Sequence, residues 1–433
     1  MRVALVGAAL LFGAWGRTAA AQAPGWGEFR AMPDNRGVIG GSLDVAWSVP
    51  MRNAVRALSV SGNILLAGAD RSGELKAIDL PTGRVIWRAR LPTSVHNDPV
   101  IADSIVVVTY GDLPMDTSPG GARAFDLRSG RMLWRYETRG AVMPSPALVG
   151  DIVVLAASDD CIHGVGISDG LRRYRQCIAL ASAMSNPKRV GTSVFFGTTE
   201  GRVVSIDGRT GAIRWIQRLP KLTHAGDATV AIGDSSLFIT GTSWGGTHSF
   251  FGDKPFWVAM RGALGAFVQE PFVQLHLFFS WQRVVSLALA DGAVQWSADI
   301  GVWRRVDRNQ AGTPALADDV LIVSSPVALT LTALRHASGQ RLWQVALPSR
   351  HRGVVTILRD TIFVGMESGL LQSYGLRTGR LLGGCQWPGA FTPTAPLVVG
   401  TTFLYGATDG VLRAVPIKEL VSRMRTGGAC IQP

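Results

Sequence analysis

Short apolar runs separated by polar, glycine-containing turns recur along almost the whole chain. The first complete unit predicts four strands, at 57–60, 64–69, 75–79 and 85–90, and apolar residues fill nearly every position in them. Such continuously apolar strands are typical of sheets that are covered on both faces. Between the third and fourth strands, Thr or Ser precedes Gly, which adopts the positive φ of a tight turn without steric cost.

A large aromatic residue follows this turn glycine by four positions. Clear copies of the pattern end at Trp87, Trp134, Trp215, Trp296 and Trp343, and weaker copies end at Tyr174, Phe256 and Gly383. Successive copies lie 40 to 47 residues apart. A period of this length, built from short strands, predicts an all-β fold, a β-propeller of four-stranded blades. We expect each aromatic ring to pack over the adjoining blade.

The two ends of the chain are predicted to close the ring. Trp47 lies 40 residues before Trp87 and has no first three strands of its own, whereas 397–417 has three strands and lacks the turn and aromatic residue. The N-terminal strand should therefore join the C-terminal blade. Nine repeat units can be counted, but the unit at Phe256 is weak, and the ring has eight blades if that unit is an elaboration.

The N-terminus has the pattern of a secretory signal. Arg2 precedes an uncharged apolar run at 3–15, and small residues at 19–21 offer a cleavage site before Gln22. The run is shorter than the roughly 20 residues that a membrane span needs. We expect a signal peptide at 1–21, an N-terminal segment at 22–42, a single propeller at 43–417 and a tail at 418–433. A disordered or membrane-anchored N-terminus is the alternative.

Export to an oxidising compartment, the periplasm or the exterior, predicts disulfides among the four cysteines. Cys161 and Cys177 are equally distant from Asp169, in the middle of a turn, so they should face each other across a hairpin. By elimination, Cys385 would pair with Cys430. Four buried free thiols are the alternative.

The chain is basic, with 43 Lys and Arg against 31 Asp and Glu. This balance favours a protein or an anionic envelope component as partner, although it also fits a merely basic surface. We expect no nucleic acid partner, because the basic residues form no run and the protein is predicted to be exported. We also expect a monomer without a transmembrane span. The sequence contains no HExxH or CxxC motif, and no catalytic residue is nominated.

In four-stranded blades, the loop between strands two and three shares one face of the ring with the connections between blades. We call this the variable face, because the insertions fall there, at 111–120, 242–251 and 302–310. Variable loops on a rigid scaffold commonly carry binding residues. The candidates are Asp112, Asp116, Trp244, Phe250, Phe251, Arg304 and Arg305. The three aromatic residues could equally be packing for a weak blade.

Polar residues where the chain enters each blade should line the mouth of the central channel. They are His96, Asp98, Asn186, His224, Asp227, Glu270, Asn309 and His351. Such a ring could hold a metal, a quinone or a sugar, but polar side chains are ordinary at a wet channel mouth. No spacing among the histidines predicts a metal site.

The repeated pattern A-x-D-x-x-[TS]-G-x-x-x-W resembles the tryptophan-docking repeat of the pyrroloquinoline quinone (PQQ) propeller superfamily and covers nearly all of the mature chain. The resemblance implies eight blades. It also implies one of two functions, that of a quinoprotein dehydrogenase or that of a non-catalytic scaffold such as the propeller lipoprotein of the outer-membrane β-barrel assembly machine.

The sequence departs from both branches. It lacks the adjacent cysteine pair of the dehydrogenases and any motif for their calcium site, and no cysteine follows the predicted cleavage site as in the lipoprotein. Its short length and the closure by both termini resemble the scaffold. We therefore expect a scaffold that binds a protein or an envelope component and needs no cofactor. A dehydrogenase that uses PQQ with calcium, and a glycan-binding module that uses Trp244, are the alternatives.

Overall fold

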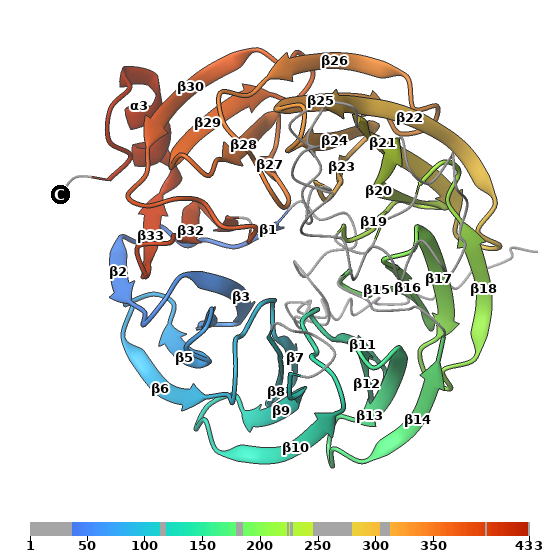
Figure 1. The fold of residues 1–433 in the computed structure, drawn as a ribbon. Coiled ribbons are helices and arrows are strands. Elements are labelled where there is room, and N and C mark those ends of the chain that lie inside the picture. The colour runs from blue at the N-terminus through green and yellow to red at the C-terminus, as the bar shows by residue number, and fades with distance from the viewer. Residues whose placement is uncertain are drawn as a thin grey trace, which may run out of the picture.

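A computed structural model of the chain describes residues 37–112, 118–178, 185–222, 225, 228–245, 279–303, 312–394 and 396–431. The strands of these residues form eight sheets around a central axis, so the β-propeller is confirmed and it has eight blades (Figure 1). The chain builds the blades one after another, and within each blade it runs from the axis to the perimeter.

Blades one to four each contain four antiparallel strands. From the inner to the outer strand, they are β3 (Val55–Ser61), β4 (Ile64–Ala69), β5 (Glu74–Asp79) and β6 (Val85–Arg90); β7 (Val100–Ala102), β8 (Ile105–Tyr110), β9 (Gly120–Asp126) and β10 (Met132–Thr138); β11 (Ala147–Val149), β12 (Ile152–Ala157), β13 (Cys161–Gly166) and β14 (Arg172–Cys177); β15 (Lys188–Val190), β16 (Ser193–Gly197), β17 (Arg202–Asp207) and β18 (Ile213–Arg218).

Blades five to seven repeat this arrangement, and blade eight takes strands from both ends of the chain. The strands of blades five to seven are β19 (Ala231–Ile232), β20 (Ser236–Gly245), β21 (Phe279–Ala288) and β22 (Val294–Trp303); β23 (Ala315–Ala317), β24 (Val320–Ser325), β25 (Thr330–Arg335) and β26 (Arg341–Ala346); β27 (Thr356–Leu358), β28 (Thr361–Gly365), β29 (Leu370–Gly375) and β30 (Leu381–Gln386). Blade eight contains β31 (Leu397–Val399), β32 (Thr402–Gly406), β33 (Val411–Pro416), β1 (Val38–Ile39) and β2 (Trp47–Pro50).

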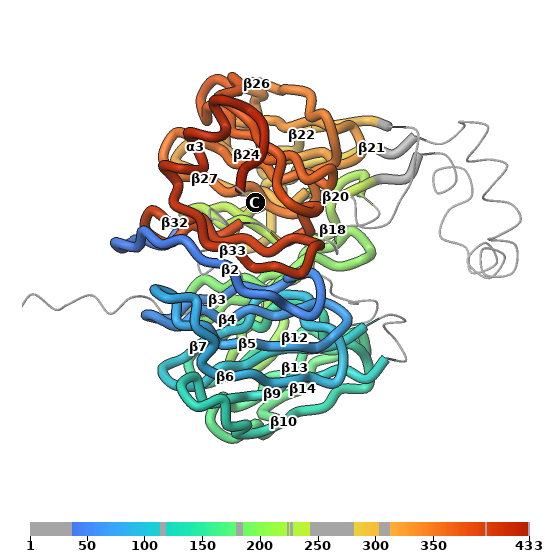
Figure 2. Tube along the Cα trace, turned by 90° about the vertical axis from the view of Figure 1, so that its left-hand side faces the viewer, coloured from blue at the N-terminus to red at the C-terminus, as the bar shows by residue number. Residues whose placement is uncertain are grey.

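The ring is closed as the sequence predicts, with one addition. β2 pairs antiparallel with β33 and becomes the outer strand of blade eight, next to blade one (Figures 1 and 2). β1, which falls in the predicted N-terminal segment, adds a fifth strand by pairing parallel with β31. Both termini therefore contribute to blade eight.

The described residues form no ninth blade. Trp215 and Trp296 are 81 positions apart, or about two repeats, but the described strands that follow β18 form one blade, β19 to β22, in which β20 pairs directly with β21. Phe256 lies between these two strands in the sequence, outside the described residues. The prediction that the unit at Phe256 is an elaboration is thus confirmed, and the nine-bladed alternative is wrong.

Each repeat aromatic binds the neighbouring blade in the same way. The ring nitrogens of Trp47, Trp87, Trp134, Trp215, Trp296 and Trp343 and the hydroxyl of Tyr174 donate to a backbone carbonyl of the next blade, at 2.7 to 3.2 Å. Each ring also covers the turn glycine of that blade. A Cβ atom on Gly130, for example, would lie 2.6 Å from the ring of Trp87. The repeat therefore needs both residues, the ring on one blade and the bare glycine on the next.

The copy of the repeat that ends at Gly383 has no aromatic residue, because blade eight has no turn between a third and a fourth strand for an aromatic ring to cover. The outer strand of blade eight comes from the N-terminus, so β33 has no turn into a fourth strand and continues into the helix α3 (Ile417–Thr426). The helix packs on β30 instead, and a Cβ atom on Gly383 would lie 2.5 Å from the carbonyl oxygen of Met424. Leu420 and Met424 of this helix are buried.

The docking interaction predicts a large loss of stability in Trp87→Ala. Because the Trp87 side chain is only 8 % exposed, the truncation should cost about 3 to 5 kcal/mol of unfolding free energy. Leu171→Ala, at a residue that is 61 % exposed, is the control and should cost less than about 0.5 kcal/mol. Denaturant unfolding measures both variants, and equal losses would contradict the docking role of Trp87.

Candidate functional site

The structure describes one of the seven candidates on the variable face completely. Asp112 is half-buried, and its carboxylate accepts a hydrogen bond from the Ser94 hydroxyl at 2.9 Å. Trp244 lies in β20, where its backbone is opposite Ser280, and its side chain is not described. The other five candidates lie outside the described residues: Asp116, Phe250, Phe251, Arg304 and Arg305.

Blade five carries a further pair of residues on this face. Its strands β20, β21 and β22 are ten residues long, whereas the second, third and outer strands of the other complete blades have five to seven. Trp281 of β21 lies opposite Val302 of β22 in this extension. The two residues are 37 % and 44 % exposed. Val302 begins the predicted insertion at 302–310, but neither residue belongs to the repeated motif, so the sequence did not single them out as candidates.

Two of the predicted channel-mouth residues hold neighbouring blades together. The carboxylate of Asp98 accepts a hydrogen bond from the backbone N–H of Leu58 at 2.9 Å. The Asn186 amide oxygen accepts one from the N–H of Ser145 at 2.7 Å, and its amide nitrogen donates to the Thr229 hydroxyl at 2.8 Å. Asp98 and Asn186 are buried, and these bonds satisfy polar atoms that would be costly to leave unpaired.

His351 and His96 are the other channel-mouth candidates that the structure describes. His351 is buried, and its Nδ1 donates to the carbonyl of Gly365 at 2.7 Å. The Nδ1 atom of His96 lies 3.7 Å from the Asp70 carboxylate, which also pairs with Arg56 at 3.2 Å. Burial lowers the pKa of His96, and the attraction of Asp70 opposes this change. His224, Asp227, Glu270 and Asn309 lie outside the described residues.

Both predicted disulfides are confirmed. Cys161 and Cys177 are directly opposed in the ladder of β13 and β14, with their Cα atoms 4.0 Å apart. Cys385 bonds Cys430, with a Cα–Cα distance of 5.0 Å, and this bond fastens the chain after α3 to β30. The described part of the chain contains no free cysteine.

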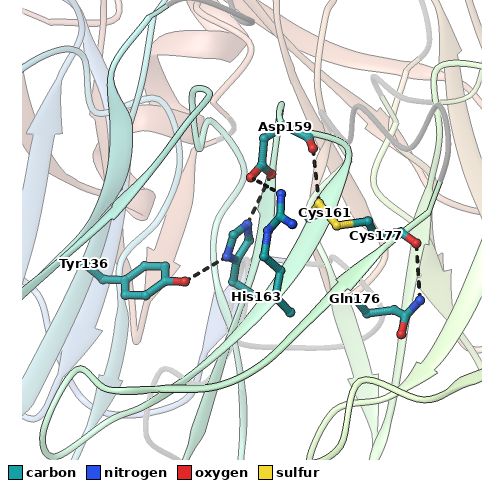
Figure 3. Close-up of a disulfide and its surroundings, with 7 residues drawn as sticks. Tyr136, Asp159, Cys161, His163, Gln176 and Cys177 are labelled. Atoms are coloured by element: carbon teal, nitrogen blue, oxygen red, sulfur yellow. Dashed lines mark hydrogen bonds and ion pairs between the residues drawn. A yellow bond between two sulfur atoms is a disulfide. The ribbon is translucent and has the colours of Figure 1, made fainter.

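A buried histidine next to the first disulfide links blades two and three (Figure 3). The Nδ1 atom of His163 lies 2.9 Å from the hydroxyl of Tyr136, and its Nε2 atom lies 3.2 Å from the Asp159 carboxylate. Arg175 pairs with the other oxygen of Asp159 at 3.1 Å. In neutral His163, Nε2–H donates to Asp159 and Nδ1 accepts from Tyr136, so both ring nitrogens have partners.

Burial lowers the pKa of His163, and the hydrogen bond and negative charge of Asp159 only partly offset this effect. The side chain is 3 % exposed. The contacts therefore favour a neutral imidazole in the folded protein.

Among the described residues, no group of three or more His, Cys, Asp or Glu side chains could hold a metal ion. The same part of the chain has no helix of sufficient length and apolarity to span a membrane.

A family model described as "Outer membrane protein assembly factor BamB" matches residues 44–238 and 280–419, which is most of the chain. Tetrathionate hydrolase of Acidithiobacillus ferrooxidans is 25% identical over 134 residues, a match that spans 30% of this chain and 27% of that protein.

Solved structures share the fold at low identity. BamB from Moraxella catarrhalis is 17% identical, with a TM-score of 0.63, and the alignment covers 86% of this chain and 98% of that one. Quinohemoprotein alcohol dehydrogenase from Comamonas testosteroni is 13% identical, with a TM-score of 0.64, and the alignment covers 93% of this chain and 82% of that one. At these identities the likeness shows the fold alone.

The contacts of His163 predict a pH-dependent stability. The unfolded chain binds a proton at His163 more readily than the folded protein does, so the free energy of unfolding should fall as the pH drops below the ordinary histidine pKa of about 6.5. His163→Gln should lose less stability than the wild type between pH 7.5 and pH 5.5, measured by denaturant unfolding at each pH. His96→Gln is measured in the same way, because burial also lowers the pKa of His96 and this residue should therefore contribute to the pH dependence in the same direction. Equal pH dependence in wild type and His163→Gln would contradict this account.

Proposed function

Because the chain belongs to the outer membrane protein assembly factor BamB family, we propose that it is an exported scaffold that assists outer-membrane protein assembly by binding another protein. The match of the family model over most of the propeller is the observation that carries this proposal. The protein acts as a monomer without a cofactor and performs no catalysis.

Export is supported by the chemistry of the cysteines. Both disulfides join strands or segments that are already adjacent in the fold, and such bonds form and persist in oxidising compartments. The apolar run at 3–15 and the small residues before Gln22 supply the signal peptide. The mature protein then begins at Gln22 and resides in the periplasm or outside the cell.

The variable face is the proposed binding surface. The docked aromatic residues and the inner-strand hydrogen bonds hold the blades rigidly, so the loops of this face are presented on a fixed frame. On blade five, Trp281 and Val302 offer exposed apolar surface, and tryptophan is enriched among the residues that dominate protein interfaces. Arg304 and Arg305, which follow β22 in the sequence, would supply basic contacts for an acidic partner.

Two other functions have weaker support. The dehydrogenases share the propeller, but this chain has no adjacent cysteine pair, and its four cysteines form two disulfides. A glycan-binding module would depend on Trp244, whose side chain is not described. Both remain hypotheses.

Site-specific cross-linking tests the binding face with a matched control. Val302 and Val294 are opposite ends of the same strand and are 44 % and 41 % exposed. A photo-reactive residue at position 302 should cross-link, in intact cells, to a component of the outer-membrane protein assembly machinery that mass spectrometry identifies. The same residue at position 294 should not.

Trp281→Ala should weaken the binding of that cross-linked protein by about 2 kcal/mol, roughly 30-fold, when affinity is measured under conditions in which the variant is fully folded. Equal cross-linking at both positions, or unchanged affinity in Trp281→Ala, would contradict the assignment of this face.

A further inference from the structure

The outer strands of the ring carry a strongly uneven charge. The four outer strands of blades one to four contain one carboxylate, Glu137, and eight exposed arginines, here called the arginine rim: Arg88, Arg90, Arg135, Arg172, Arg173, Arg175, Arg214 and Arg218. The outer strands of blades five to seven contain only Asp299 and Arg341 as charged residues among those described. One half of the perimeter is therefore basic and the other is nearly neutral.

Protection of the sheet edges does not explain this distribution. Charged side chains on an outer strand keep its free backbone edge from pairing with another chain. That purpose would be met by either sign of charge and would apply to every blade. In blade seven, however, Leu381 and Leu382 are 50 % and 41 % exposed on an outer strand without any charge.

The positive charge is least compensated on blades one and two. Arg173, Arg175 and Arg214 form ion pairs with Asp169, Asp159 and Asp207, at 2.6, 3.1 and 2.6 Å. By contrast, Arg88, Arg90 and Arg135 form no ion pair with any described residue. The single carboxylate of these strands, Glu137, is occupied by Arg123, at 3.5 Å, and by the Tyr110 hydroxyl.

The repeat places these arginines at equivalent points of successive blades. Arg88 follows Trp87, Arg135 follows Trp134 and Arg175 follows Tyr174. Successive residues of a strand point to opposite sides, and the aromatic ring faces the next blade, so each arginine lies on the other side of its outer strand. Figure 1 shows these strands, β6, β10 and β14, one after another along the perimeter.

The curvature of the perimeter favours one kind of anionic partner for the arginine rim. Each blade is turned by an eighth of a circle from its neighbour, so a flat lipid surface would meet only one or two blades at once, whereas an extended polypeptide can follow the curve. Guanidinium groups pair with carboxylates through two parallel hydrogen bonds. Met132 and Leu171, 47 % and 61 % exposed beside the arginines, add apolar contacts that suit a peptide with mixed side chains.

We propose that the arginine rim of blades one to three binds an extended, acidic segment of a partner protein. This surface is separate from the variable face, and the proposal does not depend on the function proposed above. The free edge of an outer strand can also pair with an extended segment, and the arginines would then select an acidic one.

Charge reversal tests the proposal by fluorescence anisotropy of a labelled peptide of alternating glutamate and valine, with the full-length mature protein at low salt. The triple variant Arg88→Glu, Arg90→Glu, Arg135→Glu should weaken binding about tenfold or more. The control triple Arg335→Glu, Arg341→Glu, Arg380→Glu changes the net charge equally, at exposed positions of blades six and seven, and should leave affinity within about twofold. Both triples should keep the wild-type denaturation midpoint.

Equal weakening by the two triples would show that only net charge matters and would overturn the proposal. The absence of any binding by the wild-type protein would do the same. A third arm uses vesicles that contain phosphatidylglycerol. The protein could bind these vesicles but not the peptide, and lose vesicle binding in the first triple variant only. That result would overturn the proposed polypeptide partner and identify a lipid surface as the partner instead.

Discussion

The packing of an aromatic ring on one blade over a bare glycine on the next is the interaction on which the rest of this structure depends. It fixes the distance and the rotation between neighbouring blades at once, because the ring also donates a hydrogen bond to a carbonyl beside that glycine. Trp47 makes the same contact across the junction of the two chain ends, from blade eight to blade one. Seven of the eight junctions between blades use this contact, and it recurs with the blade, about every 40 residues over most of the chain.

The eighth junction shows how the closure of the ring changes the rule. A blade completed by the N-terminal strand has no turn between its third and fourth strands. An aromatic residue on the preceding blade would therefore have no turn glycine to cover. The helix α3 packs against Gly383 instead, and the disulfide between Cys385 and Cys430 fastens the segment that follows the helix. The weak repeat and the cysteine-containing tail are therefore two consequences of the same closure.

Sequence reasoning predicts the parts of the structure that rest on local periodicity. The strands of blade one, the pairing of β2 with β33 and both disulfides follow from spacing and turn chemistry. The short strand β1 and the helix α3 were missed, because their positions depend on tertiary contacts that no periodic pattern reports. Asp98 and Asn186 show a further limit. The sequence identifies them as polar residues at blade entries, but only the structure shows that each bonds to the backbone of a neighbouring blade.

A scaffold function fits a molecule whose regular positions serve to hold blades together and whose variation is confined to loops and outer strands. The same fold houses quinone chemistry in other proteins, so the fold alone does not separate a scaffold from an enzyme. The direct measurement is a calorimetric titration of the purified mature protein with pyrroloquinoline quinone in the presence of calcium. The scaffold account predicts no saturable heat. Tight one-to-one binding would contradict it and would identify the chain as a quinoprotein.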